Sequence, residues 1–281
     1  MTFAVMLSVV ACYTLCAFND KYAVSKARLT GAELSFIMSA GTIFFLLILM
    51  PFMKAEVHIT PMALLPVALI TLCKYVEFSV LPKILFCMTP FELKGWVGLT
   101  LFMSYFTDVV FYGTAPSLFG IMFILVTLAG LALVARADRS EINYREIWMF
   151  LVLYLLAKFG YGLTMRTTKD ILPNNITLIL ALTVLMFISF ARIKTKDMIS
   201  RPEGMKGVLI VAAAKLPNAL GMLGENYTAS RSLANYSFIQ PLILISLFIA
   251  ALTDKKRSLP LMSKIGGVVI ACGVVGFQLM K

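Results

Sequence analysis

Long apolar runs recur along the whole chain, and short links carrying Pro, Gly and charged residues separate them. An α-helix needs about 20 apolar residues to cross the roughly 30 Å hydrocarbon core of a bilayer. The pattern therefore predicts an all-α integral membrane protein with ten transmembrane helices. The predicted spans lie near residues 3–22, 33–53, 62–83, 90–112, 116–136, 146–165, 174–191, 205–224, 233–253 and 260–280.

The spacing of these spans repeats once. Each of the last five spans begins 141 to 144 residues after its counterpart among the first five. The segment LAGLALV at 128–134 aligns with ACGVVGF at 271–277. We therefore expect two five-helix repeats, at 1–139 and 140–281. An odd number of spans per repeat inserts the second repeat upside down, and inverted repeats are typical of secondary transporters with a solute site near the midplane.

Composition supports a bilayer as the solvent. The chain is 60% hydrophobic and 14% charged, with a mean hydropathy of +0.91, whereas soluble domains carry about 25% charged residues. The net charge of +11 comes from Lys and Arg that lie mostly between apolar runs. This placement suits contact with anionic lipid headgroups better than a nucleic-acid surface. We expect the lipid bilayer and a small-molecule solute as partners, no nucleic acid, and a monomer or homodimer.

Basic residues gather on one side of the predicted bilayer. Cytoplasmic links carry an excess of Lys and Arg, so this side is predicted to be cytoplasmic and both termini to lie outside. The membrane is expected to be a bacterial inner membrane or a plasma membrane. The basic links are 23–32, 84–89, 137–145, 192–206 and 254–259.

Cysteine and histidine usage predicts no cofactor and no metal site. The five cysteines lie inside apolar segments without CxxC spacing, and the single histidine, His58, stands in a short link. Such cysteines are typical of small buried apolar side chains.

The order of spans and charges resembles a known family. A charged third span is followed closely by a fourth, a brief link enters a glycine-bearing fifth, and this order occurs twice. The most similar stretch is 225–277, with Pro241 early in the ninth span, while WVGLTLF at 96–102 has no matching proline. The chain resembles the drug/metabolite transporter (DMT) superfamily in its ten-span form with two EamA-type repeats. The resemblance implies transport of a solute such as an amino acid, a phosphorylated or nucleotide sugar, a quaternary amine or a drug.

Three lysines stand near span centres, where a charge costs about 2.5–3.5 kcal/mol on insertion scales and marks function by default. They are Lys74, Lys158 and Lys215. Lys74 and Lys215 occupy repeat-related spans, so we expect them to approach one central cavity from opposite sides. Glu77 follows Lys74 by three residues, a spacing at which side chains pair, so it is expected either to form an ion pair with Lys74 or to bind the solute. Lys158 and Lys215 have no acid at i±3 or i±4, so they are predicted to be unpaired, and one or both are expected to line the solute pathway.

Other polar and aromatic residues complete the predicted solute site, although interfacial anchoring or contact with lipid would explain each of them equally simply. Lys21 and Lys94 are interpreted as interfacial anchors. Gly and Pro beside central lysines, at 158–162 and 215–221, predict either unwound backbone at a cavity or close helix packing. Further solute-binding candidates are Asp108, Tyr75, Tyr161, Trp96 and Asn19, and candidates for proton coupling are Asp20, Glu92 and Glu225.

These features predict a secondary active transporter that works by alternating access. An excess of lysine at mid-depth favours a small carboxylate- or phosphate-bearing metabolite, with an amino acid or organic acid preferred. The alternative is an exporter of organic cations or drugs, which would use the acids and aromatic rings. An intramembrane enzyme is disfavoured, because the sequence contains no DDxxD, HExxH or GxSxG motif.

Overall fold

The computed structural model describes residues 2–25, 28–52, 60–88, 90–137, 144–193, 195–201, 203–253 and 260–279. Every regular element in these ranges is helical, and no strand occurs among them. The basic links predicted at 137–145 and 254–259, together with His58, lie wholly or largely outside the described residues.

One continuous helix covers each of eight predicted segments. These helices are α1 (Thr2–Ser25), α2 (Gly31–Leu49), α3 (Leu64–Cys87), α6 (Leu118–Ala137), α7 (Tyr144–Thr167), α8 (Asn174–Phe190), α12 (Leu233–Thr253) and α13 (Leu261–Leu279). Short 3-10 turns, Met50–Phe52 and Pro61–Ala63, extend α2 and precede α3.

Two predicted segments consist of two helices each. The fourth is divided into α4 (Pro90–Val97) and α5 (Thr100–Tyr112), with a turn at residues 98–99. The eighth is divided at Ala214 into α10 (Gly204–Ala213) and α11 (Lys215–Arg231). A short helix, α9 (Thr195–Ser200), lies in the predicted link before α10.

Five helical segments of the described chain are long and apolar enough to cross a membrane: Phe3–Asp20, Gly31–Leu49, Pro61–Cys87, Glu146–Thr167 and Gly204–Arg231. Shorter apolar helices lie at Leu118–Val134, Asn174–Phe190, Leu233–Ile249 and Leu261–Phe277. The outer surface is apolar as well. Phe86, Phe111 and Leu118, for example, are 76%, 75% and 80% exposed. Large exposed apolar surface marks contact with lipid or another protein, and its extent here suits a membrane protein.

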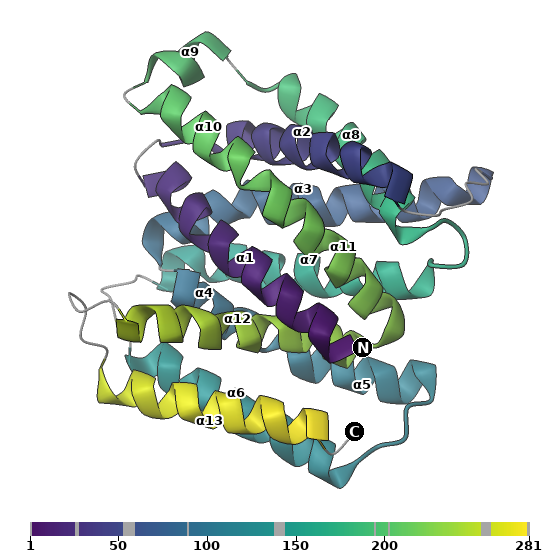
Figure 1. Cartoon of the computed structure of the whole chain (residues 1–281), viewed down its shortest axis with the longest axis vertical. Coiled ribbons are helices and arrows are strands. Elements are labelled where there is room, and N and C mark those ends of the chain that lie inside the picture. Colours follow the sequence, from purple (N-terminus) through teal and green to yellow (C-terminus); the bar gives the residue numbers. More distant parts are fainter. Residues whose placement is uncertain are drawn as a thin grey trace.

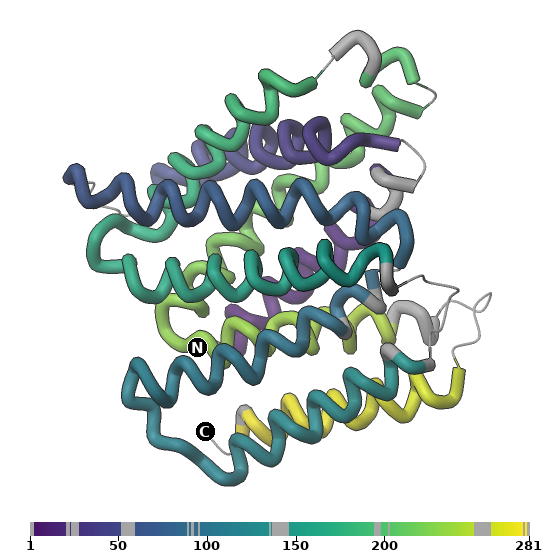
Figure 2. Tube along the Cα trace, turned by 180° about the vertical axis from the view of Figure 1, so that it is seen from behind, coloured from purple at the N-terminus to yellow at the C-terminus, as the bar shows by residue number. Residues whose placement is uncertain are grey.

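The long helices lie side by side, and consecutive ones run in opposite directions (Figure 1). Helix α1 and the α10–α11 pair cross the other helices obliquely on one face. The chain begins and ends at the same edge of the bundle, which we call the terminal edge. Helix α1 ends, and α2 begins, at the opposite edge, which we call the link edge (Figures 1 and 2).

Small residues contribute to the most extensive helix contact, which joins α6 to α13. A methyl group added at Gly130 would lie 2.8 Å from the backbone nitrogen of Ile270, and one added at Gly266 would lie 2.9 Å from the carbonyl oxygen of Gly130. Glycine lets two helix backbones approach this closely. Other extensive contacts pair α3 with α7, α1 with α11, α2 with α8, α1 with α12, α3 with α8 and α5 with α12.

The glycines of 158–162 serve packing, since α7 continues unbroken through them. A methyl group at Gly160 would lie 3.2 Å from the sulfur of Cys73, and one at Gly162 would clash with the ring of Tyr236. Pro217 also lies within a continuous α11, so the backbone break falls immediately before Lys215 instead of after it. Of the two explanations for 158–162, unwound backbone is therefore wrong.

Candidate functional site

A narrow cavity lies inside the bundle, between helices of the N-terminal and C-terminal parts of the chain. It contains about 610 Å³ of empty space, its open part included. Five charged side chains line it: Asp20, Lys74, Glu77, Lys94 and Lys158. Asp20 lies near the end of α1 and Lys94 near the start of α4, so the cavity extends from mid-depth toward the link edge.

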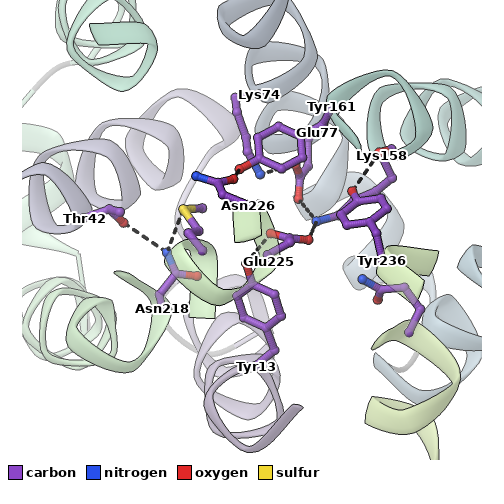
Figure 3. Close-up of polar contacts among 12 residues, drawn as sticks. Tyr13, Thr42, Lys74, Glu77, Lys158, Tyr161, Asn218, Glu225, Asn226 and Tyr236 are labelled. Carbon is purple, nitrogen blue, oxygen red and sulfur yellow. Dashed lines mark hydrogen bonds and ion pairs between the residues drawn. The ribbon is translucent and has the colours of Figure 1, made fainter. Parts of the chain in front are cut away.

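Glu77 on α3 lies between two lysines (Figure 3). Its Oε2 is 2.9 Å from Nζ of Lys74 and its Oε1 is 2.7 Å from Nζ of Lys158 on α7. Lys158 Nζ is also 3.9 Å from Oε1 of Glu225 on α11. All four side chains are nearly inaccessible to solvent. Burial of ions is costly unless each finds partners of opposite charge, and this network supplies them.

Tyrosines surround the charged network. The ammonium of Lys74 stands 4.1 Å from the ring centroid of Tyr161, a cation–π distance. Tyr161 donates its hydroxyl hydrogen bond to Oδ1 of Asn226, and Tyr13 donates one to Oε2 of Glu225. Tyr236 donates to the backbone carbonyl of Lys158 at 2.8 Å. The network therefore connects α1, α3, α7, α11 and α12.

Lys215 lies beside this cavity but does not line it. It is fully buried at the first position of α11, and its Nζ is 3.6 Å from Oδ1 of Asp20. Its aliphatic stem packs on Gly41 of α2, where an added methyl group would lie 2.7 Å from Cγ of Lys215. Asp20 stands between Lys215 and the open space. The expectation that Lys74 and Lys215 face one cavity is therefore wrong for Lys215.

The expectation of unpaired lysines at mid-depth is also wrong. Lys158 pairs with Glu77 and Glu225, and Lys215 pairs with Asp20. Each of these acids lies on a different helix from its lysine, so a search at i±3 and i±4 does not find it. Spacing along one helix reports only neighbours on that helix, so interhelical pairs were invisible to it.

Lys94 does not act as an interfacial anchor. Its side chain lines the cavity, and its Nζ donates a hydrogen bond of 2.9 Å to Oε1 of Gln240 on α12. The sequence correctly predicts a position near the end of a span. The lining of the cavity extends to this end of α4, so Lys94 lies on the cavity instead of at the membrane surface. Neither Gln240 nor the cavity residues Tyr13, Tyr154 and Asn218 were singled out from the sequence.

Asp108 lies far from the cavity, near the C-terminal end of α5 at the terminal edge. Its Oδ2 accepts hydrogen bonds from Oγ of Ser232 at 2.9 Å and from the backbone nitrogen of Ala234 at 3.0 Å. Its Oδ1 is 3.3 Å from Nε of Arg166, at the end of α7. Arg166 also stacks 4.2 Å from the ring centroid of Tyr112. These contacts join α5, α7 and α12 where the cavity does not reach.

Several predicted residues fall outside the cavity. Tyr75 accepts a hydrogen bond from Arg192 and lines an apolar groove on the outer surface of α3 and α8. Trp96 and Asn19 are half-buried and do not line the cavity. The side chain of Glu92 lies outside the described residues. Tyr161 touches the lysine network, as described above, without lining the open space.

No group of three His, Cys, Asp or Glu side chains suited to a metal occurs in the described part of the chain.

Comparison with known proteins identifies the fold and no activity. The sequence matches no protein-family model and no curated protein. One solved crystal structure, whose name carries no activity, superposes with a TM-score of 0.70 over 99% of this chain and 96% of the other. The two sequences are 11% identical, so this likeness concerns the fold alone.

Proposed function

We propose that this chain is a secondary transporter, embedded in a membrane as ten spans that form two inverted five-helix repeats. Consecutive helices run in opposite directions, and both ends of the chain lie at the terminal edge. With five spans per repeat, α7 runs opposite to α1, as an inverted repeat requires. Both interrupted segments, α4–α5 and α10–α11, then count as single spans.

The pairing of helices supports this internal symmetry. If α1 to α6 form one repeat and α7 to α13 the other, exchanging the repeats converts the α3–α7 contact into the α11–α1 contact. The contacts of α2 with α8, α5 with α12 and α6 with α13 convert into themselves. A pseudo-twofold axis predicts this pattern. The same organisation is the basis for proposing membership of the DMT superfamily, with the termini opposite the basic links and therefore outside the cytoplasm.

The observation that carries the proposal is a charged cavity whose lining runs from mid-depth toward the link edge. It extends from the buried pair of Glu77 and Lys158 toward the link edge. At the terminal edge, contacts of Asp108 with Arg166 and Ser232 join α5, α7 and the start of α12. A carrier that works by alternating access needs a midplane site that opens to one side while the other is shut. A permanent channel would need neither the closure nor buried ion pairs.

The charge balance of the network favours an anionic solute. Four cations and three anions are described in and beside the cavity: Lys74, Lys94, Lys158 and Lys215, with Asp20, Glu77 and Glu225. A buried excess of one positive charge attracts a carboxylate or a phosphate. We therefore propose a small carboxylate- or phosphate-bearing metabolite, with an amino acid or organic acid preferred.

One observation favours the alternative of an organic cation. Oε1 of Glu225 is fully buried and accepts no hydrogen bond from the described residues, and its nearest cation, Lys158, is held more closely by Glu77. A cationic solute that reached Glu225 would meet an incompletely neutralised carboxylate with Tyr13 and Tyr161 near by. We consider this second, because the solute would have to pass Lys158.

The proposal can be tested on purified protein. Thermal unfolding in detergent is followed with a panel of amino acids, organic acids, sugar phosphates and quaternary amines, and stabilising compounds are then assayed for flux into protein-containing liposomes. We expect stabilisation and saturable flux for anionic or zwitterionic members. Lys158→Gln should lose flux, whereas Lys264→Gln, at an exposed position of α13, should retain it. Stabilisation by quaternary amines alone would favour the alternative, and flux of none of these classes would refute the proposal.

A further inference from the structure

We propose that Lys94 is the residue that binds the anionic group of the solute, and that Gln240 holds the place of that group while the cavity is empty. This inference rests on the proposed transport function and names the residue that determines the charge of the solute. It differs from the prediction made from the sequence, in which Lys74, Lys158 and Lys215 were the cations that met the solute.

The other three lysines are already neutralised within the protein. Lys74 and Lys158 approach Glu77 at 2.9 and 2.7 Å, and Lys158 also faces Glu225. Lys215 does not line the cavity, and its ammonium faces Asp20 at 3.6 Å. An anion that bound one of these lysines would have to displace a buried carboxylate and leave it without its partner, which is strongly unfavourable.

Lys94 is held differently. Its ammonium lines the cavity and donates to the neutral amide oxygen of Gln240 at 2.9 Å, and no acid of the described residues forms an ion pair with it. A hydrogen bond to a charged acceptor is stronger than one to a neutral amide, so a carboxylate or phosphate should replace Gln240.

The position of Lys94 also suits a first contact. It lies in the second turn of α4, which starts at the link edge, and Pro90 at this start also lines the cavity. Its neighbours around the open space include Leu93, Phe78 and Leu85. Water around an exposed ammonium would screen its charge. The partly apolar surroundings of Lys94 instead strengthen its attraction for an anion. A compact anion with an apolar body therefore fits the space beside Lys94.

The exchange of partners would alter the contact between the two proposed repeats. Lys94 belongs to α4 and Gln240 to α12, immediately before Pro241. Helix α4 is separated from α5 by the turn at residues 98–99, and Pro241 removes a backbone hydrogen bond within α12. The helical hydrogen-bond ladder is thus interrupted close to both partners of this contact. A solute that captures Lys94 releases the α4–α12 hydrogen bond, which couples binding to a change in how the repeats contact each other.

Matched pairs of compounds that differ only in the anionic group provide the test. The probes are L-amino acids, each beside its own amino acid amide, which keeps the side chain and the ammonium but lacks the carboxylate. Inorganic phosphate is a third probe. Thermal stabilisation and flux into liposomes are measured for the wild-type protein, for Lys94→Gln and Lys94→Arg, and for the control Lys264→Gln.

We expect the wild-type protein to prefer at least one amino acid over its amide by 10-fold or more. Lys94→Gln should lower the apparent affinity for that amino acid to the level of the amide while leaving affinity for the amide unchanged within about 2-fold. Lys94→Arg should keep most of the preference, and Gln240→Leu should strengthen binding of the amino acid, because the competing acceptor is gone.

Unchanged preference in a folded Lys94→Gln variant would overturn this inference while leaving the proposed transporter intact. Equal loss of amino acid and amide would also overturn it, because it would assign Lys94 a structural role. If the wild-type protein neither binds nor transports any probe or any member of the wider panel, the proposed function itself fails.

Discussion

Lys158 on α7 and Glu77 on α3 form an ion pair of 2.7 Å between the two halves of the chain, in the interior of the bundle. The same carboxylate accepts a hydrogen bond from Lys74 at 2.9 Å. Glu77 thus contacts two buried cations at once, and its removal would leave both without this partner.

Glu77→Gln should therefore destabilise the protein by about 3–5 kcal/mol, the cost typical of removing one partner from a buried ion pair. The free energy of unfolding is measured by denaturant titration in detergent micelles. Asp170→Asn is the matched control, since Asp170 is exposed and its change should stay within about 0.5 kcal/mol. Equal stability of both variants would mean that water or a neighbouring group replaces the carboxylate.

The contact between Asp108 and Arg166 should control access from the terminal edge. Asp108→Asn weakens its ion pair with Arg166, so states open to this edge should become more populated. A cysteine at Ser237, which is buried against Ser104 of α5, reports this opening in a background without the native cysteines. We expect a membrane-impermeant thiol reagent, added on the side of the termini, to label it several-fold faster in Asp108→Asn than in the parent.

Lys206→Gln provides the comparison for the labelling experiment. The pair of Lys206 and Glu203 is exposed, at 63% and 46% of each side chain, and exposed pairs contribute about 0–1 kcal/mol. Its loss should not change the labelling rate. Identical rates in all three proteins would show that Asp108 has no role in closure.

Tyr161 is predicted to stabilise the site in two separable ways. Tyr161→Phe removes the hydrogen bond to Asn226 and leaves that buried amide oxygen without this donor, which should cost about 1–3 kcal/mol. Tyr161→Leu also removes the ring beneath the ammonium of Lys74 and should cost about 0.5–2 kcal/mol more. Both are measured as free energies of unfolding. Equal stability of the two variants would refute a cation–π contribution.

The α6–α13 contact should not accept even one additional methyl group. Gly130→Ala places this group against the backbone of α13, and overpacking of this kind costs about 1–3 kcal/mol. Ala132→Ser adds one atom at an exposed position of the same helix and should be nearly neutral. The midpoint of thermal unfolding in detergent distinguishes the two variants. If Gly130→Ala unfolds at the wild-type temperature, the helices do not approach as closely as described.

The helices themselves could be predicted from the sequence. Apolar runs bounded by Pro, Gly and charges locate the helices, because covering a helix of this length with apolar side chains leaves a recognisable local pattern. The run at 233–253 coincides with α12. The interruption at residues 98–99 was not predicted, because the apolar pattern continues through it. The interruption at Ala214 falls one residue before the range 215–221, where unwound backbone was one of two explanations offered.

Part of the candidate site could also be predicted. Charges within apolar segments identified Lys74, Glu77 and Lys158, because the cost of burying a charge makes such residues rare. The roles of Lys94 and Asp20 could not be read in this way. Both stand near span ends, where a charged residue is ordinary, and only the arrangement of α1 and α4 around the cavity distinguishes them from anchors.

The sequence by itself determined that the chain is helical and apolar, and which charges have to be buried, because these properties depend on local composition and on the cost of placing a charge away from water. The tertiary structure alone decided which charge meets which. Glu77 meets Lys158, Glu225 faces the same lysine, and Lys215 turns to Asp20. Each of these pairs joins different helices, and the contacts between helices depend on the shape of the whole packed bundle rather than on spacing along any one of them.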